Sequence, residues 1–157
     1  MFRNVFLLSL CFASGVAVAA DQGEKFFNCK PTTVFYQNQE VSFKQDLKPG
    51  LAAVYLLHNT SHETLILDHK KANVGAGAGW ASEIAPNHWS AMMISDKQFN
   101  LQCSVVGKNG FEKRDCAVLK VCQPKNMAII QAEGNYWTEE DKSLTDLKKN
   151  LEGKHID

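Results

Sequence analysis

The chain has 157 residues, of which 45% are hydrophobic and 22% are charged. This length suits one domain, and this balance excludes an intrinsically disordered protein. The 17 basic residues equal the 17 acidic residues in number. Equal numbers exclude a protein that binds nucleic acid through a strong basic excess.

The first 20 residues have the pattern of a Sec-type signal peptide. Arg3 gives a basic start, residues 5–18 are apolar or weakly polar, and Ala17-Val18-Ala19 places small residues before a cleavage site. The apolar stretch is shorter than the about 20 residues that a transmembrane helix needs, although an uncleaved anchor helix is the alternative. We therefore predict a signal peptide over residues 1–20, a mature domain over 21–157 without a membrane span, and a periplasmic or secreted location.

The mature chain contains short apolar segments separated by turn residues such as Pro49-Gly50 and Lys108-Asn109-Gly110. This pattern indicates strands rather than helices, and the alternation is clearest over residues 99–106. Since no helix separates these strands, we predict a mainly β fold, an antiparallel β-sandwich of the immunoglobulin-like or cupredoxin-like kind. The expected strands are 33–36, 41–43, 52–58, 64–68, 89–95, 99–106, 117–122 and 127–131.

A single helix is predicted near the C-terminus, over about residues 139–152. Thr138 is a suitable N-cap, and the acidic residues at 139–141 would favour the helix dipole. Gly153 can end the helix. Apolar side chains share one face at helical spacing: Leu144, Leu147 and Leu151.

Glycines alternate with alanines in residues 72–79. A phosphate-binding loop would have a helix directly after its glycines, whereas Trp80 follows here. We therefore expect a mobile loop.

Four cysteines remain after the signal peptide: Cys29, Cys103, Cys116 and Cys122. An even number in an exported chain indicates disulfides, and we expect the pairs Cys103–Cys116 and Cys29–Cys122. The strand pattern turns Cys103 toward the core but Cys116 and Cys122 away from it, so these pairs need a bulge or a second packed layer. Zinc is the rival interpretation, although no two cysteines have the close spacing of a structural zinc site.

Three histidines surround the hairpin expected between residues 52–58 and 64–68: His58, His62 and His69. Imidazole groups suit copper or zinc. Exposed loop histidines are the alternative that we favour, because no helix holds the three at a fixed spacing. A blue-copper site is disfavoured, since no histidine lies between Cys122 and Met127. We predict no metal and no cofactor.

No catalytic residues are predicted, because the chain lacks a Gly-x-Ser-x-Gly motif and its cysteines are assigned to disulfides. Trp80 and Tyr136 are candidates for exposed aromatic side chains that bind a ligand, whereas Trp89 is expected in the core. The chain is therefore expected to be a non-catalytic binding protein. The alternatives are an envelope hydrolase that acts on peptidoglycan or glycans, and a periplasmic copper- or zinc-binding protein.

Several motifs, taken in order, carry a family resemblance. They are Tyr55-Leu56-Leu57-His58-Asn59, Pro86-Asn87-His88-Trp89-Ser90-Ala91, Phe99-Asn100-Leu101-Gln102-Cys103, Cys116, Val121-Cys122-Gln123, Gly134-Asn135-Tyr136-Trp137 and Lys142-Ser143-Leu144. Over about residues 51–150 the chain resembles the enhanced entry protein B family, small exported proteins of intracellular bacterial pathogens. The resemblance implies a role in virulence, namely entry into or survival within host cells. It implies a partner in the envelope or the host, either protein or glycan, and no catalytic residue.

Overall fold

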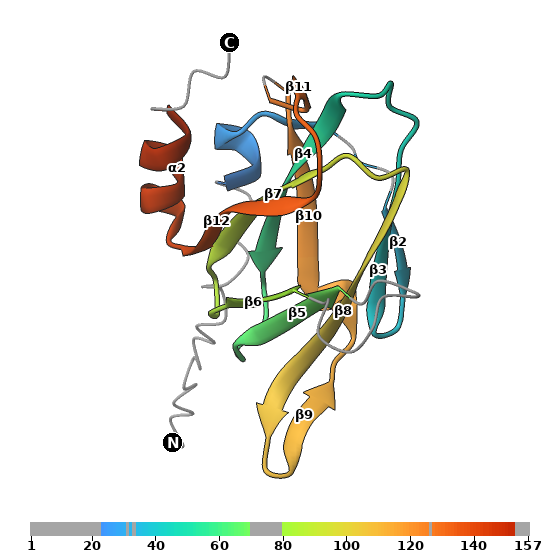
Figure 1. Cartoon of the computed structure of the whole chain (residues 1–157). Helices are drawn as coiled ribbons and strands as arrows, with labels where there is room; N and C mark the ends of the chain where they lie inside the picture. The colour runs from blue at the N-terminus through green and yellow to red at the C-terminus, as the bar shows by residue number, and fades with distance from the viewer. Residues whose placement is uncertain (1–22, 31, 33, 70–79, 126, 153–157) are drawn as a thin grey trace, which may run out of the picture.

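The computed structural model describes residues 23–30, 32, 34–69, 80–125 and 127–152 (Figure 1). The predicted signal peptide (1–20) and glycine-rich loop (72–79) lie outside these residues. The described chain forms two antiparallel sheets packed face to face, with one C-terminal helix. The predicted mainly β sandwich with a C-terminal helix is therefore confirmed.

Sheet 1 has the strand order β1-β10-β4-β7-β12, and β11 also pairs with β4. Its strands are β1 (Cys29–Lys30), β4 (Leu51–Asn59), β7 (Trp89–Ile94), β10 (Leu119–Pro124), β11 (Ile129–Gln131) and β12 (Tyr136–Lys142). Sheet 2 has the order β2-β3-β8-β5-β6, and β9 also pairs with β8. Its strands are β2 (Val34–Gln37), β3 (Glu40–Lys44), β5 (Leu65–His69), β6 (Trp80–Ile84), β8 (Gln98–Gly107) and β9 (Gly110–Lys113).

The main core lies between the two sheets. In β8, buried and less buried residues alternate along residues 99–105, which confirms the pattern expected from the sequence. Phe43 packs edge-on against Tyr55, with ring centroids 4.9 Å apart, and so connects the inner faces of the two sheets. The remaining inward side chains are mainly aliphatic, as expected for a sandwich.

A second apolar layer covers the outer face of sheet 1. The helix α2 (Leu144–Glu152) lies beside β12 and β7, and a helical turn at residues 23–26 lies beside it (Figure 1). Leu147 and Leu151 of α2 pack in one cluster with Leu56 and Trp89. Trp89 is buried, as expected, but in this second layer. Because β4 packs on both faces, residues 52–59 are all buried.

The predicted helix boundary is wrong. Residues 136–142 form β12, which pairs with β7, and the helix starts only at Leu144. Thr138 is not an N-cap, because its hydroxyl donates to the carbonyl of Ala91 on β7 (3.2 Å). Ser143 takes the capping role, since its Oγ accepts from the backbone N of Asp146 (3.2 Å). The acidic residues that suggested a first helical turn instead lie on an edge strand.

The inferred outward direction is wrong for Cys116, whereas Cys122 does face away from the main core. Residues 116–118 form a 3-10 turn rather than a strand, so Cys116 is buried in the main core while Ala117 is exposed. Cys122 does point away from the main core, but it enters the second layer and is buried there. The second layer therefore resolves the conflict that the strand pattern raised.

Candidate functional site

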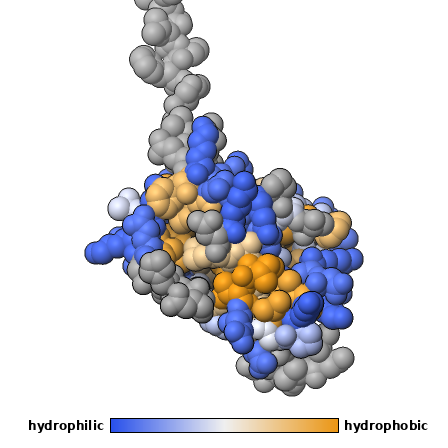
Figure 2. Space-filling model, turned by 90° about the horizontal axis from the view of Figure 1, so that it is seen from above, coloured by the Kyte–Doolittle hydropathy of each residue, from blue (hydrophilic) through white to orange (hydrophobic). Residues whose placement is uncertain are grey.

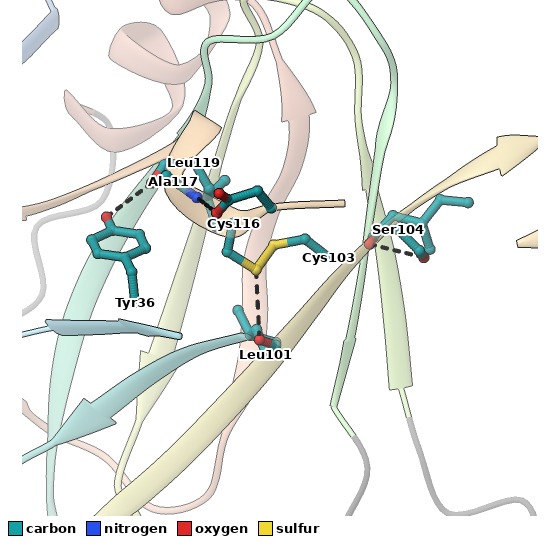
Figure 3. Close-up of a disulfide and its surroundings, with 9 residues drawn as sticks. Tyr36, Leu101, Cys103, Ser104, Cys116, Ala117 and Leu119 are labelled. Carbon is teal, nitrogen blue, oxygen red and sulfur yellow. Dashed lines mark hydrogen bonds between the residues drawn. A yellow bond between two sulfur atoms is a disulfide. The ribbon is translucent and has the colours of Figure 1, made fainter. Parts of the chain in front are cut away.

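Both disulfides join the expected partners: Cys103 to Cys116 and Cys29 to Cys122. Figure 3 shows the first pair, where the Cys116 turn lies against β8 and Cys116 Sγ is 4.0 Å from the carbonyl oxygen of Leu101. The second pair joins the neighbouring strands β1 and β10, and its two cysteines pack in the second layer. Two disulfides are typical of proteins that mature in an oxidising environment outside the cytosol.

An apolar groove lies on the outer face of sheet 1, with a volume of about 340 Å³. Its floor comes from β4, β7 and β12, and its walls from the end of α2 and the segment before β11. The lining residues are Val54, Met93, Met127, Tyr136, Trp137, Thr138 and Leu151. Figure 2 looks down on the end of the molecule that carries β11 and the end of α2, and it shows hydrophobic side chains gathered there among hydrophilic ones.

Tyr136 is the most accessible aromatic residue of this groove, with 41% of its surface exposed. It lies opposite Met93 in the register of β12 and β7, and its hydroxyl group points to Met93 Sδ at 3.4 Å. An aromatic ring next to a thioether forms a polarisable and adaptable apolar surface. Tyr136, predicted from the sequence as a ligand-binding residue, thus lines a concave surface.

The turn before β12 determines where Tyr136 lies. Asn135 Oδ1 accepts hydrogen bonds from the backbone N of Ser95 (2.9 Å) and of Asp96 (3.2 Å). Gly134 has a φ of +87°, which a residue with a Cβ adopts only with strain, and its N donates to Ser95 Oγ (2.9 Å). These contacts tie the start of β12 to the end of β7 and fix the position of the tyrosine.

Trp80, the other predicted ligand-binding residue, is the first residue of β6 and pairs with His69 through the backbone. Its side chain lies outside the described part of the structure. Since β6 belongs to sheet 2, the two predicted aromatic residues are on different sheets. The prediction that Trp80 binds a ligand therefore concerns a side chain outside the described residues.

The three candidate metal ligands have separate environments. His58 is buried, stacks on Trp89 with ring centroids 4.2 Å apart, and its Nε2 is 3.0 Å from Asn87 Oδ1. His62 is exposed in the turn before β5. His69 is the last residue of β5 and stacks on Phe99. Among the described residues, no group of three or more His, Cys, Asp or Glu side chains is placed to hold a metal ion. The suggested metal site is therefore not assembled by these histidines.

Burial lowers the pKa of His58 below its ordinary value, although the hydrogen bond to Asn87 opposes this effect. The neutral ring donates from Nε2 to Asn87 Oδ1, so its Nδ1 carries the lone pair. That Nδ1 is buried and has no hydrogen-bond partner among the residues that the structure describes. His58 is thus a neutral component of the second layer.

His88 and Asp141 form a pair that the sequence analysis missed. His88 Nδ1 is 2.8 Å from Asp141 Oδ1, and the same oxygen accepts from the backbone N of Ala85 (2.8 Å). These contacts connect the turn between β6 and β7 to β12. Within the described chain, no hydroxyl or thiol group forms a hydrogen bond with His88 Nε2. The contacts of Asp141 with His88 and Ala85 link the two sheets at this edge.

Comparisons with protein-family models, with curated proteins and with solved structures find no match to this chain. In the part of the chain that the structure describes, no helix is both long enough and apolar enough to cross a membrane.

Proposed function

We propose that this chain is a non-catalytic binding domain that acts outside the cytosol and holds apolar side chains of a partner protein in the groove beside Tyr136. The observation that carries this proposal is the groove itself, with its exposed aromatic ring, two methionines and rigid strand floor. The lining residues that the structure describes carry no carboxylate, imidazole, ammonium or thiol group. Such a surface suits binding through burial of apolar area.

The size of the groove supports a segment of a protein as its occupant. A volume of about 340 Å³ is at the lower end for small-molecule sites, and it matches two or three apolar side chains. Methionine and tyrosine are enriched at protein interfaces because they adapt to several side-chain shapes. The resemblance to the enhanced entry protein B family adds the proposal that the partner belongs to the bacterial envelope or the host cell.

Selection of displayed peptides on the oxidised protein tests this proposal. We expect the selected peptides to share a cluster of apolar residues and to lose at least about tenfold in affinity when Tyr136 is replaced by alanine, a change of about 1.4 kcal/mol. Phe35→Ala is the matched control. Phe35 is 46% exposed, close to the 41% of Tyr136, but it belongs to β2 on the other sheet.

Peptides that bind the Tyr136→Ala and Phe35→Ala variants equally well would contradict the proposal.

A zymogram separates this function from the hydrolase alternative. Clearing of peptidoglycan by the purified protein, abolished by a Glu-to-Gln substitution, would show an enzyme instead. Equilibrium dialysis with copper or zinc addresses the carrier alternative, for which at least one equivalent of tightly bound metal would be required.

A further inference from the structure

We infer that the outer face of sheet 2 is a second binding site, one that takes a neutral oligosaccharide. A hollow of about 360 Å³ lies where β5, β6, β8 and β9 meet. Unlike the groove beside Tyr136, this hollow presents polar side chains of several kinds: Asp68, Gln102, Ser104 and Lys113. The two sites lie on different sheets and can be tested separately.

The strand register arranges these polar side chains as a grid. Asp68 is directly opposite Gln102, and Ser104 is directly opposite Lys113. Facing residues on neighbouring strands are about 5 Å apart at Cβ, and Gln102 and Ser104, two residues apart on one strand, are separated by about 7 Å. These spacings are comparable to the width of a pyranose ring, so neighbouring side chains can reach different hydroxyl groups of one sugar.

Within the described part of the chain, the polar groups of the grid have unused hydrogen-bonding capacity. Among the described residues, the side chains of Asp68, Gln102 and Lys113 have no hydrogen-bond or ion-pair partner, and Ser104 Oγ makes only a 3.4 Å bond to the carbonyl of Ile66. Together they offer a carboxylate acceptor, an ammonium donor, and an amide and a hydroxyl that do both. Sugar hydroxyl groups also both donate and accept, which matches this mixture.

An exposed aromatic ring completes the site. Phe111 of β9 lines the hollow and is 75% exposed, and it lies opposite Val106, which is 73% exposed. Figure 1 shows that β9 and the end of β8 form a hairpin that extends beyond the rest of sheet 2. An aromatic face beside polar groups suits the C–H face of a sugar ring, whereas such exposure is unusual for a side chain that only packs.

Charge and rigidity favour an uncharged ligand on a fixed surface. Asp68 and Lys113 have opposite charges, so the hollow has no net charge for a strongly anionic or cationic ligand. Beneath it, Cys103 lies between Gln102 and Ser104 and is bonded to Cys116 on the core side of β8 (Figure 3). The disulfide holds the strand that supplies the centre of the grid, which reduces the entropy lost on binding.

Titration of the ¹⁵N-labelled oxidised protein with tri-N-acetylglucosamine and maltotriose, followed by NMR, tests this inference. We expect at least one of them to shift backbone amide signals of β8 and β9 with a dissociation constant of about 1 mM, typical for a few hydrogen bonds and one aromatic contact. Gln102→Ala and Phe111→Ala should each weaken binding by at least about tenfold. Phe35→Ala, on the far edge of sheet 2, and Tyr136→Ala should leave it unchanged.

Three results would overturn the inference. One is the absence of shifts with either sugar at about 20 mM, well above the expected dissociation constant. Another is binding that survives both Gln102→Ala and Phe111→Ala, while the amide spectra show that the variants are folded. The third is binding only to a sulfated oligosaccharide, which would assign the surface to anions. Because Tyr136→Ala leaves this site intact, failure here is distinguishable from failure of the groove proposal.

Discussion

Removal of the Cys29–Cys122 disulfide should destabilise the domain more than most single changes can. The two cysteines are 93 residues apart in sequence. Closing a loop of this length lowers the conformational entropy of the unfolded chain. This stabilises the folded state by about 4.6 kcal/mol at 25 °C. Domains of this size have a total stability of about 5–15 kcal/mol, so the Cys29→Ala/Cys122→Ala variant should unfold at a much lower denaturant concentration.

Guanidinium unfolding of the double variant and of Cys29→Ala alone provides the assay. Because either change opens the same loop, the two variants should lose similar free energies of unfolding. The shorter Cys103–Cys116 loop, with a separation of 13 residues, gives a loss of about 3 kcal/mol from loop closure and serves as the comparison. A loss below about 1.5 kcal/mol for the Cys29–Cys122 pair would contradict stabilisation by loop closure, which predicts about three times as much.

Three further changes test how the layers are held together. Gly23→Ala should destabilise the protein by about 1–3 kcal/mol in chemical denaturation, because a Cβ at Gly23 would overlap the ring of Trp89; an unchanged midpoint would contradict that contact. Asn59→Ala should cost about 2–4 kcal/mol, because the fully buried amide donates 2.8 Å bonds to the carbonyls of Glu63 and Ile84; a loss below about 1 kcal/mol would mean that these bonds add little. Burial lowers the pKa of His58 in the folded state, so the unfolded chain binds this proton more tightly, and stability should fall as the pH drops below about 6.5. His58→Gln should reduce this slope in unfolding experiments between about pH 7 and 5, whereas an unchanged slope would assign it to other groups.

The sequence predicted most of the strands because their patterns reflect burial. The alternation in β8 and the apolar runs of β4 and β7 produce recognisable signals when a strand packs on one or both faces. In contrast, β9 was not predicted, because all four of its residues are exposed and its pairing depends on the hairpin turn. Strand β12 was taken for the start of a helix because Thr138 and the acids after it match a helix N-terminus in sequence.

The candidate sites were harder to predict because they depend on tertiary contacts. Tyr136 was identified as an exposed aromatic residue, but its groove also needs Val54, Met127 and Leu151, which are distant in sequence. The polar grid of sheet 2 depends on the register between β5 and β8, which residue types do not reveal. The disulfide pairs were predicted correctly. The outward direction of Cys122 is explained by the second layer, in which it is buried.

Binding of a partner in the groove beside Tyr136 can be followed through the methyl NMR signals of the methionines. Met93 and Met127 line the groove, whereas Met92, next in sequence to Met93, is completely buried in the main core. We predict that a selected apolar peptide shifts the methyl signals of Met93 and Met127 and leaves that of Met92 in place. A peptide that binds without shifting the signal of either groove methionine would contradict binding in this groove.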